Sequence, residues 1–339
     1  MSLLRQDPTT KDWVIIAPQR AKRPDQFAQS SPHPSSEALP VHDPSCPFCP
    51  GNETLTPPEI LRLSDSGTGE WQVRVVPNKF PALQPTGPSA YRTPHTLFYE
   101  MDGVGSHEVI IETPRHNERL ALMSDQDVAM ILRACQRRYR DLLAHPHVNS
   151  VVLFKNHGKR AGTSLQHPHM QVVAAPIAPV LMRRKVEVAT TYYDETGRCL
   201  YSDMVEAELQ AGSRIVIKKD GYVVFQPFAS RLPFETWIMP HRPVPSFALV
   251  SEEDLPKVAS VLRRTLAVLD TALQNPDFNL VLHSVPTTGG ACAWFSWHIQ
   301  ILPRLTAIAG FELGSGMFIN TLLPEESAKI LRNAYEALP

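Results

Sequence analysis

Three polar side chains alternate along the segment LQHPHMQ: His167, His169 and Gln171. On an extended chain, side chains two residues apart point to the same face of a sheet, so these three are expected to lie together. Polar groups are costly to bury on such a face unless they have partners. The spacing therefore predicts a strand that presents two imidazoles and one amide to a site with its own chemistry.

His169 has the chemistry of a nucleophile toward phosphorus. An imidazole acts in this way when one ring nitrogen faces the substrate and the other is held by an acceptor such as a carbonyl. The Gln171 amide can donate to a phosphoryl oxygen, and residues 162–164, Gly-Thr-Ser, offer N–H groups and hydroxyls of the kind that hold phosphates. Arg20 and Arg23 add fixed positive charge for a diphosphate. Each alone is an ordinary polar residue, but together they indicate nucleotidyl transfer.

A second group of residues has the composition of a metal site. Cys46 and Cys49 are separated by two residues in the turn CPFCPGN, a common half-site of tetrahedral zinc centres. His116 and His167 can complete the set. Four protein ligands leave no position for a substrate, so such a site is structural. The alternative is a pair of reduced, partly buried thiols.

The chain also contains a degenerate duplication. Residues 107–128 and 234–255 share one plan: an apolar strand, a Pro-containing connection, and a Ser three residues before an acid, which is typical of a capping-box entry to a helix. Amphipathic helices and further apolar strands follow in both copies. We therefore expect an α+β protein of two halves, residues 1–180 and 181–339, each an antiparallel sheet with a helix packed on it.

The two copies differ in their polar residues. His169 corresponds to His298 and Gln171 to Gln300, but His167 corresponds to Ser296, and His116 corresponds to a proline in the second copy. The Cys pair, the paired arginines and the Gly-Thr-Ser loop likewise occur only in the first half. The sequence therefore predicts one active site per chain, centred in the first half.

Composition excludes several classes of protein. The 339 residues are 43% hydrophobic and 20% charged, with a net charge of −1, so no basic excess suggests a nucleic-acid or membrane surface. No apolar run approaches the roughly 20 residues of a membrane span, and the start lacks the layout of a signal peptide. Five cysteines do not form a disulfide framework. A cytoplasmic protein without nucleic-acid or membrane partners is expected.

Several longer motifs extend along nearly the whole chain. They are PQRAKRP, CPFCPGN, VVPNKFPAL, LFKNHGKRAGTSLQHPH, PFETWIMP and AGFELGSG, together with HPHxQ at residues 167–171. In these motifs the chain resembles the galactose-1-phosphate uridylyltransferase family of the histidine-triad superfamily. The resemblance implies two histidine-triad-like halves and homodimers whose active sites take residues from the partner subunit. It also implies a ping-pong reaction, in which UDP-glucose leaves uridylyl on a histidine and galactose 1-phosphate then collects it.

The resemblance implies roles for individual residues. His169 matches the nucleophile that carries the nucleotidyl group. The residues that match a structural zinc set, with one ion per chain, are Cys46, Cys49, His116 and His167. The residues that match positions near the nucleotide and its phosphates are Arg20, Arg23, Asn78, Phe80, Phe154, Asn156, Gly162, Ser164 and Gln171. Glu312 matches a hexose contact, in a segment that family members supply from the partner subunit.

One departure from the family pattern supports an alternative substrate. Thr306-Ala307 stands where a well-studied branch has Lys-Phe, and WHIQILPRLTAIAGFELGSG is more similar to the branch that includes ADP-glucose phosphorylase. The first expectation is a UDP-glucose–hexose-1-phosphate uridylyltransferase that acts on a nucleotide sugar and galactose 1-phosphate. The alternative is an adenylyltransferase similar to ADP-glucose phosphorylase.

Other classes fit less well. A histidine-triad hydrolase would have a third His at Gln171, and an amide does not exchange protons at neutral pH, so a transferase is favoured. A zinc-dependent nucleic-acid module is disfavoured by the balanced charge and the lack of an aromatic–basic face. A second metal would have only fragments of a ligand set, in Cys199, His283, His298 and a carboxylate such as Glu187. We therefore expect one zinc ion per chain.

Overall fold

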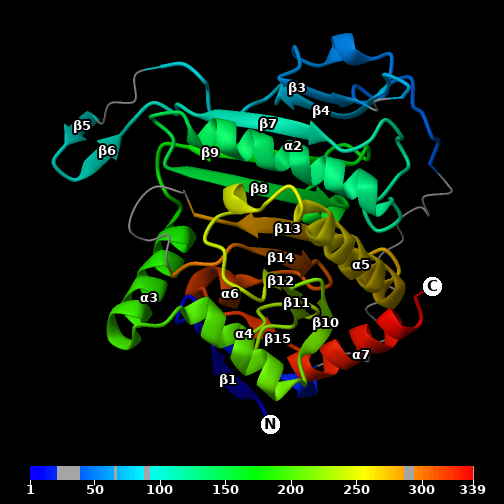
Figure 1. The fold of residues 1–339 in the computed structure, drawn as a ribbon. Helices are drawn as coiled ribbons and strands as arrows, with labels where there is room; N and C mark the ends of the chain where they lie inside the picture. Colours follow the sequence, from blue (N-terminus) through cyan, green and yellow to red (C-terminus); the bar gives the residue numbers. More distant parts are fainter. Residues whose placement is uncertain (21–38, 65–66, 88–91, 286–293, 339) are drawn as a thin grey trace.

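The computed structural model describes residues 1–20, 39–64, 67–87, 92–285 and 294–338. In this part of the chain the main feature is a ten-stranded antiparallel sheet of order β10-β11-β12-β14-β13-β8-β9-β7-β4-β3 (Figure 1). The strands are β3 (Leu61–Ser64), β4 (Trp71–Pro77), β7 (Ser106–Ile111), β8 (Ser150–His157), β9 (His169–Ala175), β10 (Ile215–Lys219), β11 (Tyr222–Phe225), β12 (Thr236–Pro240), β13 (Phe278–His283) and β14 (His298–Pro303).

Smaller elements surround this sheet. A second sheet contains β1 (Leu3–Gln6), β2 (Trp13–Ile16) and β15 (Ile319–Asn320), and a hairpin contains β5 (Arg92–His95) and β6 (Phe98–Glu100). The helices are α2 (Asp125–Leu143), α3 (Val180–Thr196), α4 (Leu200–Ala211), α5 (Leu255–Leu273), α6 (Gly310–Ser315) and α7 (Pro324–Glu336), with 3₁₀ turns η1 (Pro18–Arg20), η3 (Glu53–Leu55), η4 (Lys159–Ala161) and η5 (Phe247–Leu249). No helix within the described ranges has both the length and the apolar character needed to cross a membrane.

The predicted α+β fold class is confirmed. The sheets expected in the two halves join edge to edge into a single ten-stranded sheet. Strand β13 of the second half pairs with β8 of the first half, so that Val281 lies opposite Phe154. A boundary near residue 180 coincides with the start of α3. Because β2 near the chain start pairs with β15 near its end, the division into 1–180 and 181–339 stays a prediction.

Helices α2 and α5 cover the same face of the sheet (Figure 1). The Ser124 hydroxyl accepts from the N–H of Asp127, and the Asp127 carboxylate accepts from the N–H of Ser124, a complete capping box at the start of α2. In the second copy the Ser251 hydroxyl accepts from the N–H of Asp254, 3.1 Å away, and α5 begins at the next residue. The repeated Ser-x-x-Asp signal therefore marks equivalent helices.

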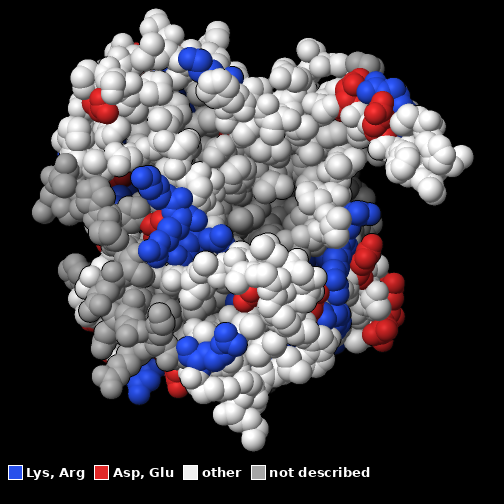
Figure 2. Space-filling model, turned by 180° about the vertical axis from the view of Figure 1, so that it is seen from behind, with Lys and Arg blue, Asp and Glu red and all other residues white. Residues whose placement is uncertain are grey.

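The opposite face of the sheet is covered unevenly. In the C-terminal half, α3 and α4 bury this face in a cluster that includes Tyr201 and Trp237. In the N-terminal half, Met170 of β9 packs into the core under α2, so strand alternation turns His169 and Gln171 to the other face. The view from behind in Figure 2 is hollowed near its centre, beside a group of Lys and Arg side chains.

A buried ion pair lies at the start of β9. Lys155 Nζ contacts the two carboxylate oxygens of Glu112 at 2.7 and 2.8 Å and the His169 carbonyl at 3.3 Å. Burial raises the pKa of Glu112, and the neighbouring Lys155 ammonium opposes this shift. The pair therefore ties the ends of β7 and β8 to the first residue of β9.

Replacing Lys155 by Met should lower the free energy of unfolding by about 3–5 kcal/mol, because it leaves the Glu112 carboxyl buried without its cation. The double variant Lys155→Met/Glu112→Leu should recover a large part of this loss, since neither charge is then buried. Urea unfolding at neutral pH measures both values. A double variant no more stable than the single variant would show that the pair is not the cause.

Candidate functional site

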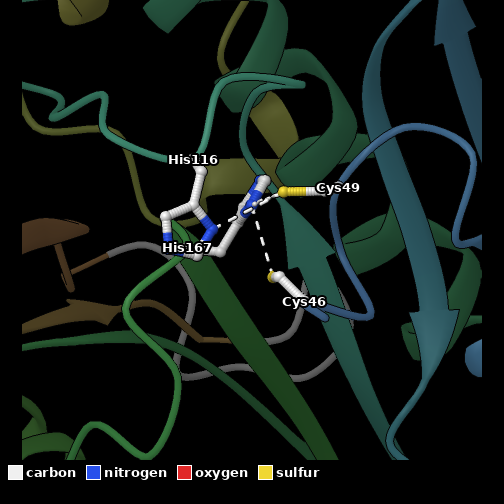
Figure 3. Close-up of side chains that lie close together, drawn as sticks. All are labelled: Cys46, Cys49, His116 and His167. Carbon is white, nitrogen blue, oxygen red and sulfur yellow. Dashed lines mark hydrogen bonds between the residues drawn. The ribbon is translucent and has the colours of Figure 1, made fainter. Parts of the chain in front are cut away.

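Four ligand-type side chains converge beside the start of β9: Cys46, Cys49, His116 and His167 (Figure 3). All four are buried, and their ligand atoms lie within 4.8 Å of one another. The Nδ1 atom of His167 is 3.7 Å from Cys46 Sγ and 3.6 Å from Cys49 Sγ, and His116 Nδ1 is 3.5 Å from Cys49 Sγ. Tetrahedral zinc, with bonds of about 2.3 Å to sulfur and about 2.0 Å to nitrogen, spaces such ligands about 3.5 Å apart. The set can therefore hold a metal in a closed four-ligand site.

The surroundings prepare these side chains as ligands. His167 Nε2 donates to the Thr113 carbonyl at 2.7 Å, which leaves the Nδ1 lone pair toward the sulfurs. Burial lowers the pKa of His167 to about 4, so the ring is neutral at physiological pH. Burial also raises the pKa of the Cys46 thiol to about 11. A metal ion would have to displace that proton, so metal binding and thiol deprotonation are coupled.

His169 is the first residue of β9, and its side chain lines the open face. Its Nδ1 donates to the main-chain carbonyl of His167, 2.9 Å away, so the lone pair of the neutral ring is at Nε2. Burial lowers the pKa of His169 to about 4, although the residue keeps 7% of its surface exposed. A neutral imidazole with a free Nε2 is the form that attacks an electrophile.

Gln171 lies two residues further along β9 and is half-buried. Its Oε1 accepts from Nε2 of His107 in the neighbouring strand β7, at 2.8 Å. No sequence motif singles out His107, although strand alternation offers a signal. Val109 lies opposite Gln171, and His107 is two residues from Val109. The imidazole and the amide therefore share the open face.

The loop after β4 lies beside this pair. Asn78 Oδ1 accepts from the main-chain N–H of Phe80, at 2.9 Å. Phe80 itself is 84% exposed. The loop is held to His107 by two further hydrogen bonds.

A cavity of about 720 Å³ runs along the connection between β8 and β9. Its lining includes Asn156, Ser164 and His169, as well as exposed Lys159 and Arg160. Gly162 in this connection has φ of 88°, a left-handed conformation that favours glycine. The volume is in the range of small-molecule sites, and the polar lining suits a phosphorylated ligand.

The structure brings only some of the predicted residues to this region. Phe154 of β8 lies directly opposite Gln171. Arg20 is exposed at the end of η1, and Glu312 lies in α6, where its carboxylate accepts from the N–H of Ala309 at 3.2 Å. Neither Arg20 nor Glu312 lines the cavity. Arg23 is outside the described residues, and the roles expected of all these residues stay predictions.

The C-terminal half repeats the imidazole geometry in a buried setting. His298 Nδ1 donates to the Ser296 carbonyl at 3.0 Å, as His169 does to the carbonyl two residues before it. His298 is 0% exposed, and Lys185 Nζ from α3 lies 2.9 Å from its Nε2. Glu187, the carboxylate expected nearby, is exposed instead. Because an amine faces the Nε2 lone pair, this arrangement disfavours a metal on His298, and one ion per chain stays a prediction.

Comparison with known proteins identifies the family. The family model described as "Galactose-1-phosphate uridyl transferase, N-terminal domain" matches residues 1–179. A further model, described as a domain of unknown function, matches residues 104–338. The chain belongs to the galactose-1-phosphate uridylyltransferase family. It is therefore a member of a nucleotidyltransferase family, as the motifs predicted.

Individual relatives are similar over almost the whole chain. An ADP-glucose phosphorylase from Arabidopsis thaliana is 32% identical over 97% of this chain and 92% of its own length. A galactose-1-phosphate uridylyltransferase from Thermotoga maritima is 28% identical over 98% of both chains. A crystal structure of an ADP-glucose phosphorylase from Arabidopsis thaliana with bound ADP-glucose has a TM-score of 0.82 at 30% identity and covers 98% of both chains.

Metal analysis of dialysed protein should give about one zinc ion per chain. The variant Cys49→Ser should lose this ion and unfold at a temperature lower by roughly 10 °C or more, because the folded state loses a bound ligand. Cys199→Ser is the matched control and should keep the zinc. Full zinc content in Cys49→Ser, or a second equivalent that disappears in His298→Ala, would contradict the assignment.

Proposed function

We propose that this chain transfers a nucleotidyl group through a covalent intermediate on His169. Nε2 forms a bond to the α-phosphorus of a nucleoside diphosphate sugar while the bond to the bridging oxygen breaks, and hexose 1-phosphate leaves with that oxygen. A phosphate oxygen of the acceptor then attacks the same phosphorus, and His169 departs as a neutral ring. The main support for this proposal is the hydrogen bond from His169 Nδ1 to the His167 carbonyl, because it leaves Nε2 unprotonated on the open face.

Neighbouring groups support the same reaction. The NH₂ group of Gln171 can donate to a phosphoryl oxygen as negative charge spreads over it in the transition state. Because Nδ1 of His169 keeps its proton throughout, neither step requires a separate base at the imidazole. The Cys/His set would hold its metal with four protein ligands, so the metal would stabilise the start of β9 without contacting substrate.

The donor is proposed to be UDP-glucose, with ADP-glucose as the second candidate. UDP-glucose with galactose 1-phosphate as acceptor is favoured by the motifs of the first half and by the family match to residues 1–179. ADP-glucose with inorganic phosphate is favoured by the 32% identity to the Arabidopsis phosphorylase and by the segment at Thr306-Ala307. Both donors fit the same two steps, because the reacting α-phosphorus is common to them.

We further propose a homodimer in the cytoplasm. The β5–β6 hairpin projects from the body of the molecule (Figure 1), and Leu97, Phe98 and Tyr99 near its tip are exposed. An exposed apolar tip suits contact with a second copy. Since Glu312 does not line the cavity of its own chain, an active site completed by the partner subunit fits its position. Among the described residues, three buried cysteines and one half-buried cysteine form no disulfide, which suits a reducing compartment.

The variant His169→Asn should abolish nucleotidyl labelling by any nucleotide sugar, because asparagine has no ring nitrogen to carry the group. Its zinc content and unfolding temperature should stay close to those of the unaltered protein. The exposed His145, replaced by Asn, is the control and should label normally. Intact-protein mass after incubation with donor measures the label, and undiminished labelling of His169→Asn would overturn the proposal.

The donor is identified by incubating the protein separately with UDP-glucose and ADP-glucose and measuring the intact mass. A uridylyl adduct that disappears on addition of galactose 1-phosphate is the expected result. An adenylyl adduct that forms much faster, and that inorganic phosphate removes, would instead assign the phosphorylase activity. The His169→Asn protein serves as the blank for both incubations.

A further inference from the structure

We infer that His107 is a positioning residue for the transfer reaction. It orients the Gln171 amide toward the phosphoryl group and anchors the loop that carries Asn78 and Phe80. This inference rests on the proposed nucleotidyl transfer, and it assigns a role to a residue that the sequence motifs do not single out.

The backbone determines which nitrogen of His107 carries the proton. The main-chain N–H of Ala82 donates to His107 Nδ1, 3.1 Å away, and a backbone N–H is always a donor. The lone pair is therefore at Nδ1, and the neutral ring carries its proton at Nε2. Nε2 then donates to Gln171 at 2.8 Å, so the facing atom of the amide must be its oxygen. The orientation of the amide thus follows from a backbone donor.

This orientation leaves the NH₂ group of Gln171 pointing away from His107. Within the described part of the chain, that group has no protein acceptor. Gln171 lies on the same face as His169, two residues along the strand, so both N–H bonds can serve a phosphoryl group attached to His169. If the amide were rotated by 180°, its oxygen would face the phosphate and the two would repel each other. The hydrogen bond from His107 prevents this orientation.

His107 also holds the loop after β4, through both its main chain and its ring. The main-chain N–H of Asn78 donates to the His107 carbonyl at 2.8 Å, in addition to the Ala82 bond to the ring. Asn78 Nδ2 also lies 3.1 Å from His107 Nε2. Because that nitrogen carries a proton, this approach is a contact and not a hydrogen bond. Residues 78–82 are therefore held at two points of His107, one on its main chain and one on its ring.

In the C-terminal half the corresponding amide, Gln300, is held by side chains on both of its sides. Gln300 Oε1 accepts from His283 Nε2 at 2.8 Å, and the Gln300 NH₂ group donates to the Glu235 carboxylate at 2.6 Å. By strand register Glu235 stands where His107 stands in the first half, two residues before the strand partner of the glutamine. In both halves a side chain at this position therefore fixes the orientation of the glutamine amide.

Two substitutions of His107 should each remove one hydrogen bond of the ring and keep the other. An asparagine side chain ends near the position of Nδ1, so His107→Asn can keep an acceptor for Ala82 but loses the donor to Gln171. A glutamine side chain reaches the position of Nε2, so His107→Gln can keep the donor but loses the acceptor. The probe is whichever of UDP-glucose and ADP-glucose labels the unaltered protein, measured by single-turnover intact mass.

For His107→Asn, the labelling rate at saturating donor should fall about 10–100-fold, because a misoriented amide no longer stabilises the transition-state charge. Its half-saturating donor concentration should change less than about 3-fold. His107→Gln should show the opposite pattern: a labelling rate within about 3-fold and a half-saturating concentration about 10-fold higher, since one loop hydrogen bond is lost. In a Gln171→Leu background, His107→Asn should cause little further loss of rate.

Urea unfolding of each variant, with His145→Asn as the surface control, separates positioning from folding. Parallel changes of rate and affinity in both His107 variants, or a full additive loss in the Gln171→Leu background, would overturn the inference. Failure of the unaltered protein to acquire any nucleotidyl group would instead overturn the proposed function. The two failures are therefore distinguished by the labelling of the unaltered chain.

Discussion

The geometry of the site depends on one hydrogen bond, from His169 Nδ1 to the main-chain carbonyl of His167. His167 is held on both sides, because its ring donates to the Thr113 carbonyl and faces two cysteine sulfurs. Any movement of the Cys/His set would therefore move the carbonyl that determines the tautomer of His169. A metal held by the four Cys and His side chains would add rigidity next to the proposed nucleophile, where the position of a lone pair matters.

The two halves show how the same local geometry acquires different properties from its surroundings. His169 and His298 both donate from Nδ1 to a carbonyl two residues earlier. Helices α3 and α4 cover the second histidine, and Lys185 faces its Nε2. Burial there lowers the pKa of Lys185 to about 7 and that of His298 well below its usual value. Of these two histidines, His169 is the one whose Nε2 lies on an uncovered face.

Family membership indicates the class of reaction, nucleotidyl transfer, but it does not identify the nucleotide sugar. The groups near His169 would act on an α-phosphorus, which is common to UDP-glucose and ADP-glucose. Groups that distinguish base or sugar must lie further away, and Glu312 and the Thr306-Ala307 segment do not line the cavity of this chain. Relatives with these different names therefore both match this chain over almost its whole length, at 32% and 28% identity.

The sequence alone was sufficient for features that depend on near neighbours. Alternation in LQHPHMQ predicted the strand that carries His169 and Gln171, but β9 begins at His169 and the expected third member, His167, lies just before it. The Ser124–Asp127 spacing predicted the start of α2. These signals are local, because strand periodicity and helix capping involve residues only a few positions apart. The resemblance to the family came from motifs that are also contiguous in the chain.

Only the tertiary structure decided which distant residues meet. His107 contacts Gln171 because β7 and β9 are adjacent and in a particular register, and Lys185 reaches His298 because α3 packs across the sheet. Spacing along the chain does not specify strand register or helix placement, so Glu187 seemed as suitable as any neighbour for His298. The open face of one half and the covered face of the other have the same origin, since burial of a side chain is a property of packing and not of its local sequence.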